Sequence, residues 1–118
     1  MNLGVVIMGQ DCGKHIKMCL DSCKEADWIV FCDGGSTDNT LEIANKYCNI
    51  TIQNKYDKID PTMNGRQRNF YLDYIKKNYP NDFCLVLDAD EVLSDDAIKQ
   101  LKKDIQVMKP GMYSVKMK

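Results

Sequence analysis

Apolar residues in this chain form short continuous runs, separated by longer segments in which they recur every three or four positions. Such continuous runs, rich in branched and aromatic side chains, are typical of strands buried on both faces of a sheet. Polar or glycine-containing stretches follow them and predict turns at the strand ends. Strands are expected at residues 3–8, 28–32, 50–53 and 83–87, with a last extended run at 112–118.

The intervening segments have the spacing of amphipathic helices. Strand and helix therefore alternate, an order that predicts an α/β fold with a mainly parallel sheet and helices on both faces. A length of 118 residues suits one domain of modest core, so we expect a single domain over residues 1–118. The inward-facing residues are expected to be Ile16, Cys19, Leu20 and Cys23; Leu41, Ala44 and Cys48; Phe70, Tyr71, Tyr74 and Ile75; and Ile98, Leu101, Ile105 and Met108.

Composition excludes several classes of partner. Lysine and arginine number 16 against 17 for aspartate and glutamate, a formal charge of -1, so no overall charge favours nucleic acid or an acidic membrane. No apolar run approaches the roughly 20 residues of a membrane span, and the N-terminus lacks the order of a signal peptide. The six cysteines show no Cys-x-x-Cys spacing and are expected to be reduced core residues. We therefore expect a cytoplasmic protein.

The fourth apolar run ends abruptly in a group of acidic residues, at Asp88, Ala89, Asp90 and Glu91. Side chains two apart on an extended backbone point to the same side, so Asp88 and Asp90 can converge on one hard divalent cation beside the small Ala89. Open α/β sheets bind their ligands at the carboxyl ends of the strands. A solvated acidic turn that binds nothing is the alternative interpretation.

Two further segments are candidate parts of a binding site. Residues 33–40 combine a strand end, a glycine turn and helix-capping residues, without the lysine of a P-loop or the glycine spacing of a dinucleotide site. Arg66 and Arg68 are predicted in the first turn of a helix, where a bound anion would offset their conflict with the helix dipole. A simple turn and a solvated basic turn remain the alternatives. His15, the only histidine, receives no role.

The order of these motifs resembles glycosyltransferase family 2, whose members have the GT-A fold. The resemblance is carried by Val-Val-Ile-Met at 5–8, the octet at 33–40, Arg68-Asn69 at a helix start, and Leu-Asp-Ala-Asp-Glu at 87–91. It implies a Rossmann-like three-layer sandwich whose N-terminal half binds a nucleoside diphosphate sugar, of UDP or GDP type, together with Mg²⁺ or Mn²⁺. The chain would then be the N-terminal, donor-binding part of a longer enzyme.

On the nucleoside side of the site, the resemblance implies two contacts. The turn at Met8, Gly9 and Gln10 would line the nucleoside pocket. Asp33 would accept hydrogen bonds from the base.

On the phosphate side, the resemblance implies that Arg66 and Arg68 lie near the diphosphate. Asp88, Ala89 and Asp90 resemble the Asp-x-Asp motif of the family and would contact the donor, with Asp88 facing the ribose and both aspartates holding Mn²⁺ or Mg²⁺. The ion would neutralise charge on the departing diphosphate as the sugar moves to an acceptor hydroxyl of a glycan, lipid or protein.

The chain departs from the family pattern in length and at two motif positions. Family members place the acceptor site and the general base in a following half, so no catalytic base is named here and little transfer is expected of this chain alone. Gln10-Asp11 and Gly34 stand where many members have Asn-Glu and a second aspartate. An open sheet without the second half would expose apolar surface near Val115 and Met117 and favour self-association. The alternatives are a module that only binds nucleotide or nucleotide sugar, and a magnesium-dependent phosphate-handling domain unrelated to sugars.

Overall fold

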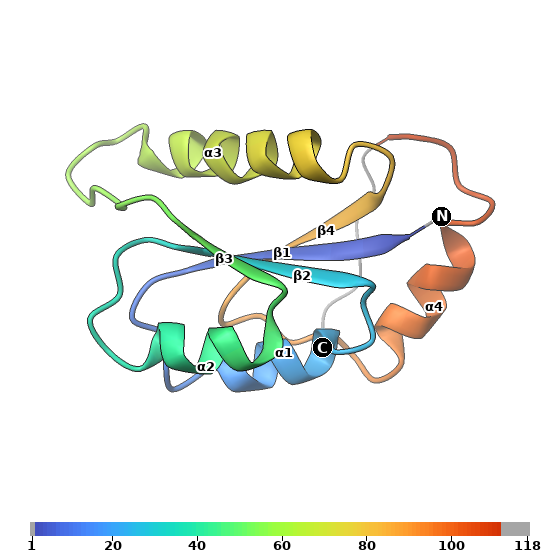
Figure 1. Cartoon of the computed structure of the whole chain (residues 1–118), viewed down its shortest axis with the longest axis horizontal. Helices are drawn as coiled ribbons and strands as arrows, with labels where there is room; N and C mark the ends of the chain where they lie inside the picture. Colours follow the sequence, from blue (N-terminus) through green and yellow to red (C-terminus); the bar gives the residue numbers. More distant parts are fainter. Residues whose placement is uncertain (1, 112–118) are drawn as a thin grey trace.

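The computed structural model describes residues 2–111, which form one parallel sheet with helices packed against it. The sheet has four strands in the order β3, β2, β1, β4, and every neighbouring pair is parallel. The alternation of strand and helix and the α/β fold class are therefore confirmed (Figure 1). The elements are β1 (Leu3–Gly9), α1 (Ile16–Cys23), β2 (Trp28–Asp33), α2 (Thr40–Tyr47), β3 (Ile50–Gln53), α3 (Met63–Asn78), β4 (Phe83–Asp88) and α4 (Ala97–Asp104).

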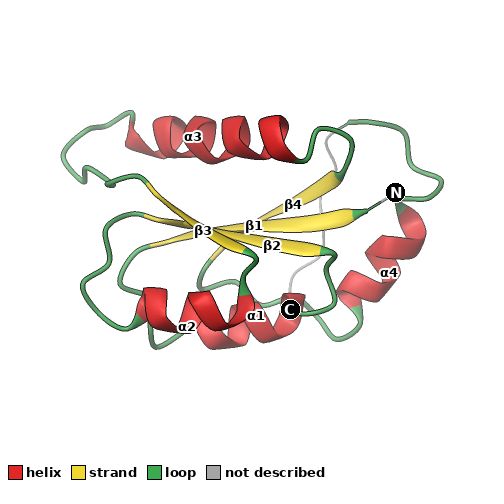
Figure 2. Cartoon of the chain, viewed as in Figure 1, coloured by secondary structure: helices red, strands yellow, loops and turns green. Residues whose placement is uncertain are grey.

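The helices lie in two layers, one on each face of the sheet (Figure 2). α3 covers one face, whereas α1, α2 and α4 lie on the other. The central strand β1 contributes to both layers: Val5 and Ile7 pack in one core cluster, and Val6 between them packs in the other. Because successive side chains of a strand point to opposite faces, a strand in this position must be apolar throughout.

The larger core cluster fills the space between the sheet and the layer of α1, α2 and α4. Ile16 and Leu20 of α1 and Phe31 of β2 are fully buried there. α4 ends at Asp104, so Met108, which was expected on this helix, packs against the core from the segment that follows it. The helical spacing of apolar residues thus continues in the sequence beyond the last residue of the helix.

α3 begins earlier than the sequence predicts. The carboxylate of Asp60 accepts hydrogen bonds from the Thr62 amide (2.8 Å) and the Thr62 hydroxyl (2.7 Å), and this turn leads the chain into a helix that starts at Met63. Arg66, the fourth residue of the helix, therefore closes the first turn, and Arg68 lies in the second. The conflict with the helix dipole that motivated an anion there is weaker for Arg68, because the dipole acts mainly within the first turn.

The side of α3 that faces the sheet is largely the predicted one, because Tyr71 and Ile75 are buried and Tyr74 packs against the same core cluster. Phe70, which was expected to point inward, is 37% exposed, so that expectation is wrong. The buried stripe repeats every four residues from the new start, and it includes one polar residue. Its members are Met63, Gln67, Tyr71 and Ile75.

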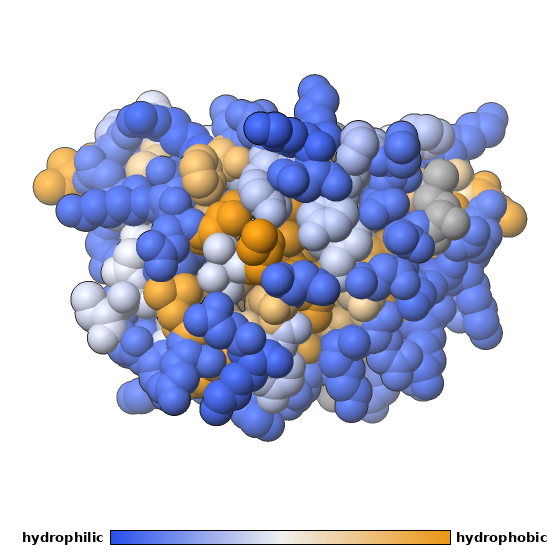
Figure 3. All heavy atoms as spheres, viewed as in Figure 1, coloured by the Kyte–Doolittle hydropathy of each residue, from blue (hydrophilic) through white to orange (hydrophobic). Residues whose placement is uncertain are grey.

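The remaining predictions concern surfaces and cysteines. All six cysteines are free thiols. Within residues 2–111, no helix is long and apolar enough to cross a membrane. Apolar side chains do gather on the face shown in Figure 3, where β3 forms the edge of the sheet and Ile50 is 41% exposed. The extended run at 112–118 and the apolar surface near Val115 and Met117 lie outside the described residues.

Candidate functional site

A cleft of about 500 Å³ opens at the carboxyl ends of the strands. The end of β1 and the residues after it, Met8 to Cys12, form one part of its lining, and Asp88 to Asp90 after β4 form another. The loop between β3 and α3 and the first turns of α3 close the third side. This is the edge at which open α/β sheets bind ligands.

The loop after β1 and the loop after β2 are joined by hydrogen bonds. The Asp11 amide donates to the Ser36 hydroxyl at 2.8 Å, and the Asp11 carboxylate accepts the Thr37 amide at 2.7 Å. Further along, the Gly13 amide donates to the Asp38 carboxylate at 3.0 Å. Asp11 adopts a φ of 49°, a left-handed conformation that aspartate tolerates better than most residues. The two loops therefore form one braced wall.

Asp33 lies inside this wall and not on the surface of the cleft. Its side chain is 1% exposed and accepts hydrogen bonds from the Gly35 amide (3.0 Å), the Ser36 amide (2.9 Å) and the Ser36 hydroxyl. Gly35 has a φ of +108°, so the turn that delivers these donors requires glycine. The carboxylate, for which the resemblance implies hydrogen bonds from a base, stabilises the loop in this structure.

The acidic element after β4 is a turn and not a continuation of the strand. β4 ends at Asp88, whose carbonyl accepts the Glu91 amide at 2.9 Å, while the Glu91 carboxylate accepts the Asp88 amide at 2.7 Å. The alternation of an extended backbone, on which the sequence argument for Asp88 and Asp90 relied, therefore stops at Asp88. Both aspartates nevertheless line the same cleft, because the turn brings Asp90 back to it.

Ala89 fixes the position of this turn against β1. Its amide donates to the Met8 carbonyl at 3.0 Å, and its side chain is 4% exposed. A Cβ placed on Gly9 would lie 2.7 Å from the Ala89 Cβ, so the two backbones are as close as these small residues allow. A small residue between the two aspartates is thus needed for contact with β1, and not only to leave room for a ligand.

Asp88 carries an electrostatic signature of a site that attracts cations. Partial burial raises the pKa of its carboxyl, the negative charges of Glu91 and Asp90 raise it further, and Arg68 opposes the shift. A cation bound between Asp88 and Asp90 would remove this repulsion. Residues 2–111 contain no cluster of three or more histidine, cysteine or acidic side chains able to hold a metal, so any ion here needs ligands beyond the protein.

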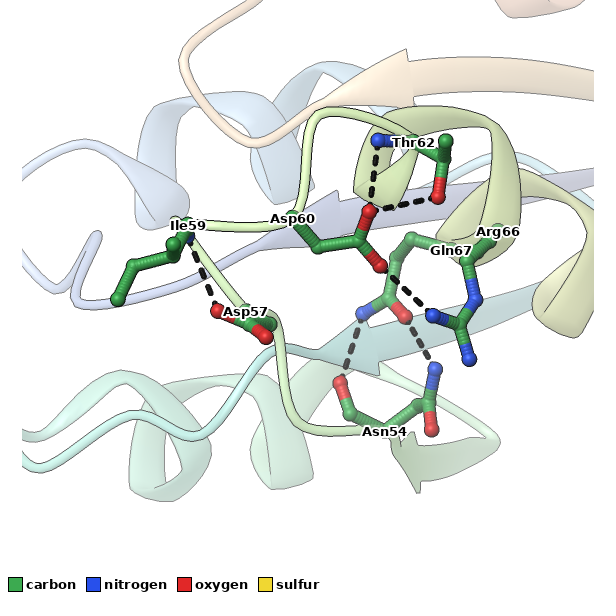
Figure 4. A network of polar contacts seen from close by, with 7 residues as sticks. All are labelled: Asn54, Asp57, Ile59, Asp60, Thr62, Arg66 and Gln67. Atoms are coloured by element: carbon green, nitrogen blue, oxygen red, sulfur yellow. Dashed lines mark hydrogen bonds and ion pairs between the residues drawn. The ribbon is translucent and has the colours of Figure 1, made fainter.

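The two arginines predicted near a diphosphate have separate surroundings. Arg66 Nη1 pairs with Asp60 Oδ2 at 2.7 Å, its side chain is 69% exposed, and it points along the loop (Figure 4). Arg68 lies close enough to Asp88 and Tyr71 to oppose the increase in pKa that burial causes in both groups. Of the two, only Arg68 stands beside the acidic turn.

Several residues that line the cleft were not identified from the sequence. Gln67 is fully buried, accepts a hydrogen bond from the Asn54 side chain (2.7 Å) and donates to the Asn54 carbonyl (2.9 Å). Tyr56 and Asn64 bond to each other across the same wall. The sequence contained one indication of these residues, a glutamine at a helical spacing from apolar residues, which suggests a buried polar contact. The lining residues without a predicted binding role are Asp11, Cys12, His15, Tyr56, Lys58, Asn64 and Gln67.

A parallel α/β sheet with a cleft at the carboxyl ends of its strands places the chain in the class of open α/β folds, and comparison with known proteins identifies the family. The family model described as "Glycosyl transferase family 2" matches residues 5–115. The match covers most of the chain, so this protein belongs to that family. A search of curated proteins found no match.

Solved structures agree with this assignment of the fold. The crystal structure of S. aureus TarS matches with a TM-score of 0.69 and 27% identity, over 90% of this chain and 20% of that one. The crystal structure of residues 1–349 of S. aureus TarS matches with a TM-score of 0.68 and 23% identity, over 97% and 39%. The architecture is therefore the Rossmann-like GT-A fold, and this chain spans well under half the length of these proteins.

Proposed function

We propose that the cleft binds the nucleoside diphosphate part of a sugar donor, of UDP or GDP type, for transfer of the sugar to an acceptor hydroxyl. The observation that carries the proposal is the turn at Asp88, Ala89 and Asp90, which presents two exposed carboxylates to a cleft in a member of glycosyl transferase family 2. We further propose that residues 1–118 form the N-terminal donor-binding part of a longer enzyme. The acceptor and the general base then belong to its remainder.

The acidic turn suits a divalent cation such as Mg²⁺ or Mn²⁺. Asp88 and Asp90 supply two hard oxygen donors. A bound cation would be stabilised by both negative charges and would reduce the repulsion between them. Mg²⁺ sites are commonly built from one or two carboxylates completed by substrate phosphates and water. When bound, such an ion would neutralise negative charge that develops on the departing diphosphate.

The other residues of the cleft have roles in binding and orientation. Met8, Gly9 and Gln10 line the floor at the end of β1, where we place the nucleoside. Asp33 stabilises the loop after β2, which is hydrogen-bonded to the loop after β1, and it reaches a base only if its own loop rearranges. Arg68, beside Asp88, offsets part of the negative charge of the turn.

The proposed location is the cytoplasm. Six cysteines that form no disulfide are what a reducing compartment favours.

Calorimetric titration of the chain with UDP and with GDP, with and without Mn²⁺, tests the donor site. We expect one of the two diphosphates to bind in the presence of Mn²⁺. Asp90→Ala should weaken this binding by at least about tenfold, equivalent to about 1.4 kcal/mol. Asp73→Ala, which removes an exposed carboxylate from α3 away from the cleft, is the matched control and should bind as the wild type does.

Two results would overturn the proposal. The first is the absence of binding of either diphosphate to the folded chain under all conditions. The second is equal affinity for the Asp90→Ala and Asp73→Ala variants in the presence of Mn²⁺, because it would show that the acidic turn takes no part.

A further inference from the structure

Lys58 is the single lysine or arginine among the residues that line the cleft in the described part of the chain. It is exposed, and across residues 2–111 it takes part in no hydrogen bond or ion pair. The other charged side chains of the lining that carry a fixed sign are carboxylates, at Asp11, Asp88 and Asp90. An exposed lysine is ordinarily solvated, so it is the position of Lys58 on the lining, and not its lack of a partner, that makes it a candidate to contact an anion in the cleft.

The loop that carries Lys58 is well anchored at its start (Figure 4). Asn54 is held by Gln67 through two hydrogen bonds, at 2.7 and 2.9 Å. The Tyr56 amide donates to the Gly34 carbonyl at 2.8 Å, and the Tyr56 hydroxyl bonds to Asn64. The chain therefore enters the segment around Lys58 from a fixed position on the wall of the cleft.

The same loop is anchored again after Lys58, and its own carboxylates are occupied. Asp57 accepts the Ile59 amide at 3.0 Å, which closes a tight turn with Lys58 at its centre. Asp60 accepts both donors of Thr62 and pairs with Arg66. Among residues 2–111 no ion pair joins Lys58 to either acidic neighbour, and Arg66 pairs with Asp60 within the loop.

The sheet places Lys58 and the acidic turn on different sides of the cleft. The loop follows β3, whereas the acidic turn follows β4, and these are the two outermost strands in the order β3, β2, β1, β4. A diphosphate carries more than one negative charge and can be held from two sides at once. A cation on Asp88 and Asp90 would hold one side, and a lysine ammonium suits the other as a flexible point charge.

We propose that Lys58 is a donor-binding residue that contacts the diphosphate from the side of the β3–α3 loop and gives the site an affinity that does not depend on a divalent cation. This inference rests on the donor-binding function proposed above and adds a residue that the family motifs do not contain. It requires that affinity without metal increases with the number of phosphates, from uridine to UMP to UDP, and that the increase disappears when Lys58 is replaced.

The test is a titration of three variants with uridine, UMP and UDP, in Mn²⁺ and in EDTA. Lys58→Ala should weaken UDP binding by about tenfold in both conditions and leave uridine binding unchanged. Lys58→Arg should retain most of the affinity for UDP. Lys55→Ala is the matched control, because Lys55 is an exposed cation of the same loop that does not line the cleft, and it should behave as the wild type does. Circular dichroism verifies that each variant is folded.

The outcomes separate this inference from the proposed function. If the wild type binds UDP with Mn²⁺ but Lys58→Ala and Lys55→Ala bind it equally well, the role of Lys58 is refuted and the donor site stands. If Lys58→Ala loses affinity for uridine and for UDP to the same extent, the residue supports the pocket without contacting phosphate, and the inference is refuted. If GDP is the preferred nucleotide, the same series is run with guanosine, GMP and GDP. If the wild type binds no member of either series, the donor-binding function itself fails.

Discussion

Aspartates at one edge of the same sheet have opposite surroundings in the two walls of the cleft. In the wall formed by the loops after β1 and β2, Asp11, Asp33 and Asp38 all accept hydrogen bonds from neighbouring backbone amides. In the turn after β4, Asp88 and Asp90 lack such donors to their carboxylates among the described residues and repel one another. The first group holds the wall together, and the second is available to a ligand.

The pKa shifts of the two walls follow the same division. A hydrogen bond from the Thr40 hydroxyl, supported by backbone donors, lowers the pKa of Asp38. Burial and two negative neighbours raise the pKa of Asp88. The lesson is that the donors around a carboxylate, and not its place at a strand end, distinguish a structural aspartate from a candidate ligand.

The largest expected effect is the loss of stability when a structural aspartate is removed. Asp33→Ala deletes a buried acceptor of three hydrogen bonds and should lower the free energy of unfolding by about 2 to 4 kcal/mol. Asp90→Ala, in the other wall, should change it by no more than about 0.5 kcal/mol. Urea denaturation of both variants measures the difference, and equal losses would contradict the division between the walls.

A smaller loss of stability is expected from a substitution where the acidic turn packs against the end of β1. Gly9→Ala places a Cβ 2.7 Å from the Ala89 Cβ and 2.8 Å from Cys12 Sγ, so the acidic turn must move away from β1. Overpacking of this kind costs about 1 to 3 kcal/mol. Gly65→Ala is the control: it lies within α3 with no atom near the new methyl group, and it should stabilise the chain by about 0.5 to 1 kcal/mol. Thermal unfolding of both variants measures these changes. An unchanged stability of Gly9→Ala would show that the close contact between Gly9 and Ala89 is absent.

The smallest effect is a dependence of stability on pH. Because the pKa of Asp88 is raised in the folded state, the folded chain holds this proton more tightly than the unfolded chain. Its contribution to stability therefore falls as the pH rises from the usual carboxyl pKa of about 4 through the raised value. Asp88→Asn should be more stable than the wild type at neutral pH, and the advantage should vanish in acid. A constant difference in melting temperature from acid to neutral pH would show that the carboxylate is not strained.

The strands and the binding edge could be predicted closely from the sequence, whereas the start of α3 and the roles of individual aspartates could not. The apolar run at 28–32 matches β2 to within one residue. A strand buried on both faces has no polar positions within it, so the change to polar residues marks its end clearly. The start of α3 was missed because it depends on Asp60 accepting a hydrogen bond from Thr62, and the local sequence there contains several polar residues of similar kind.

The sequence by itself determined that this chain is a parallel α/β protein of glycosyl transferase family 2, with an acidic segment at residues 88–91 where its fourth apolar run ends. Hydrophobic periodicity and motif order can be read from the sequence alone, and they do not depend on the conformations of the loops. Only the tertiary structure decided that Asp33 organises a loop, that Asp88 and Asp90 remain exposed, and that Lys58 reaches the same cleft from the other side. Those roles depend on which hydrogen-bond donors and charges the fold brings together from distant parts of the chain.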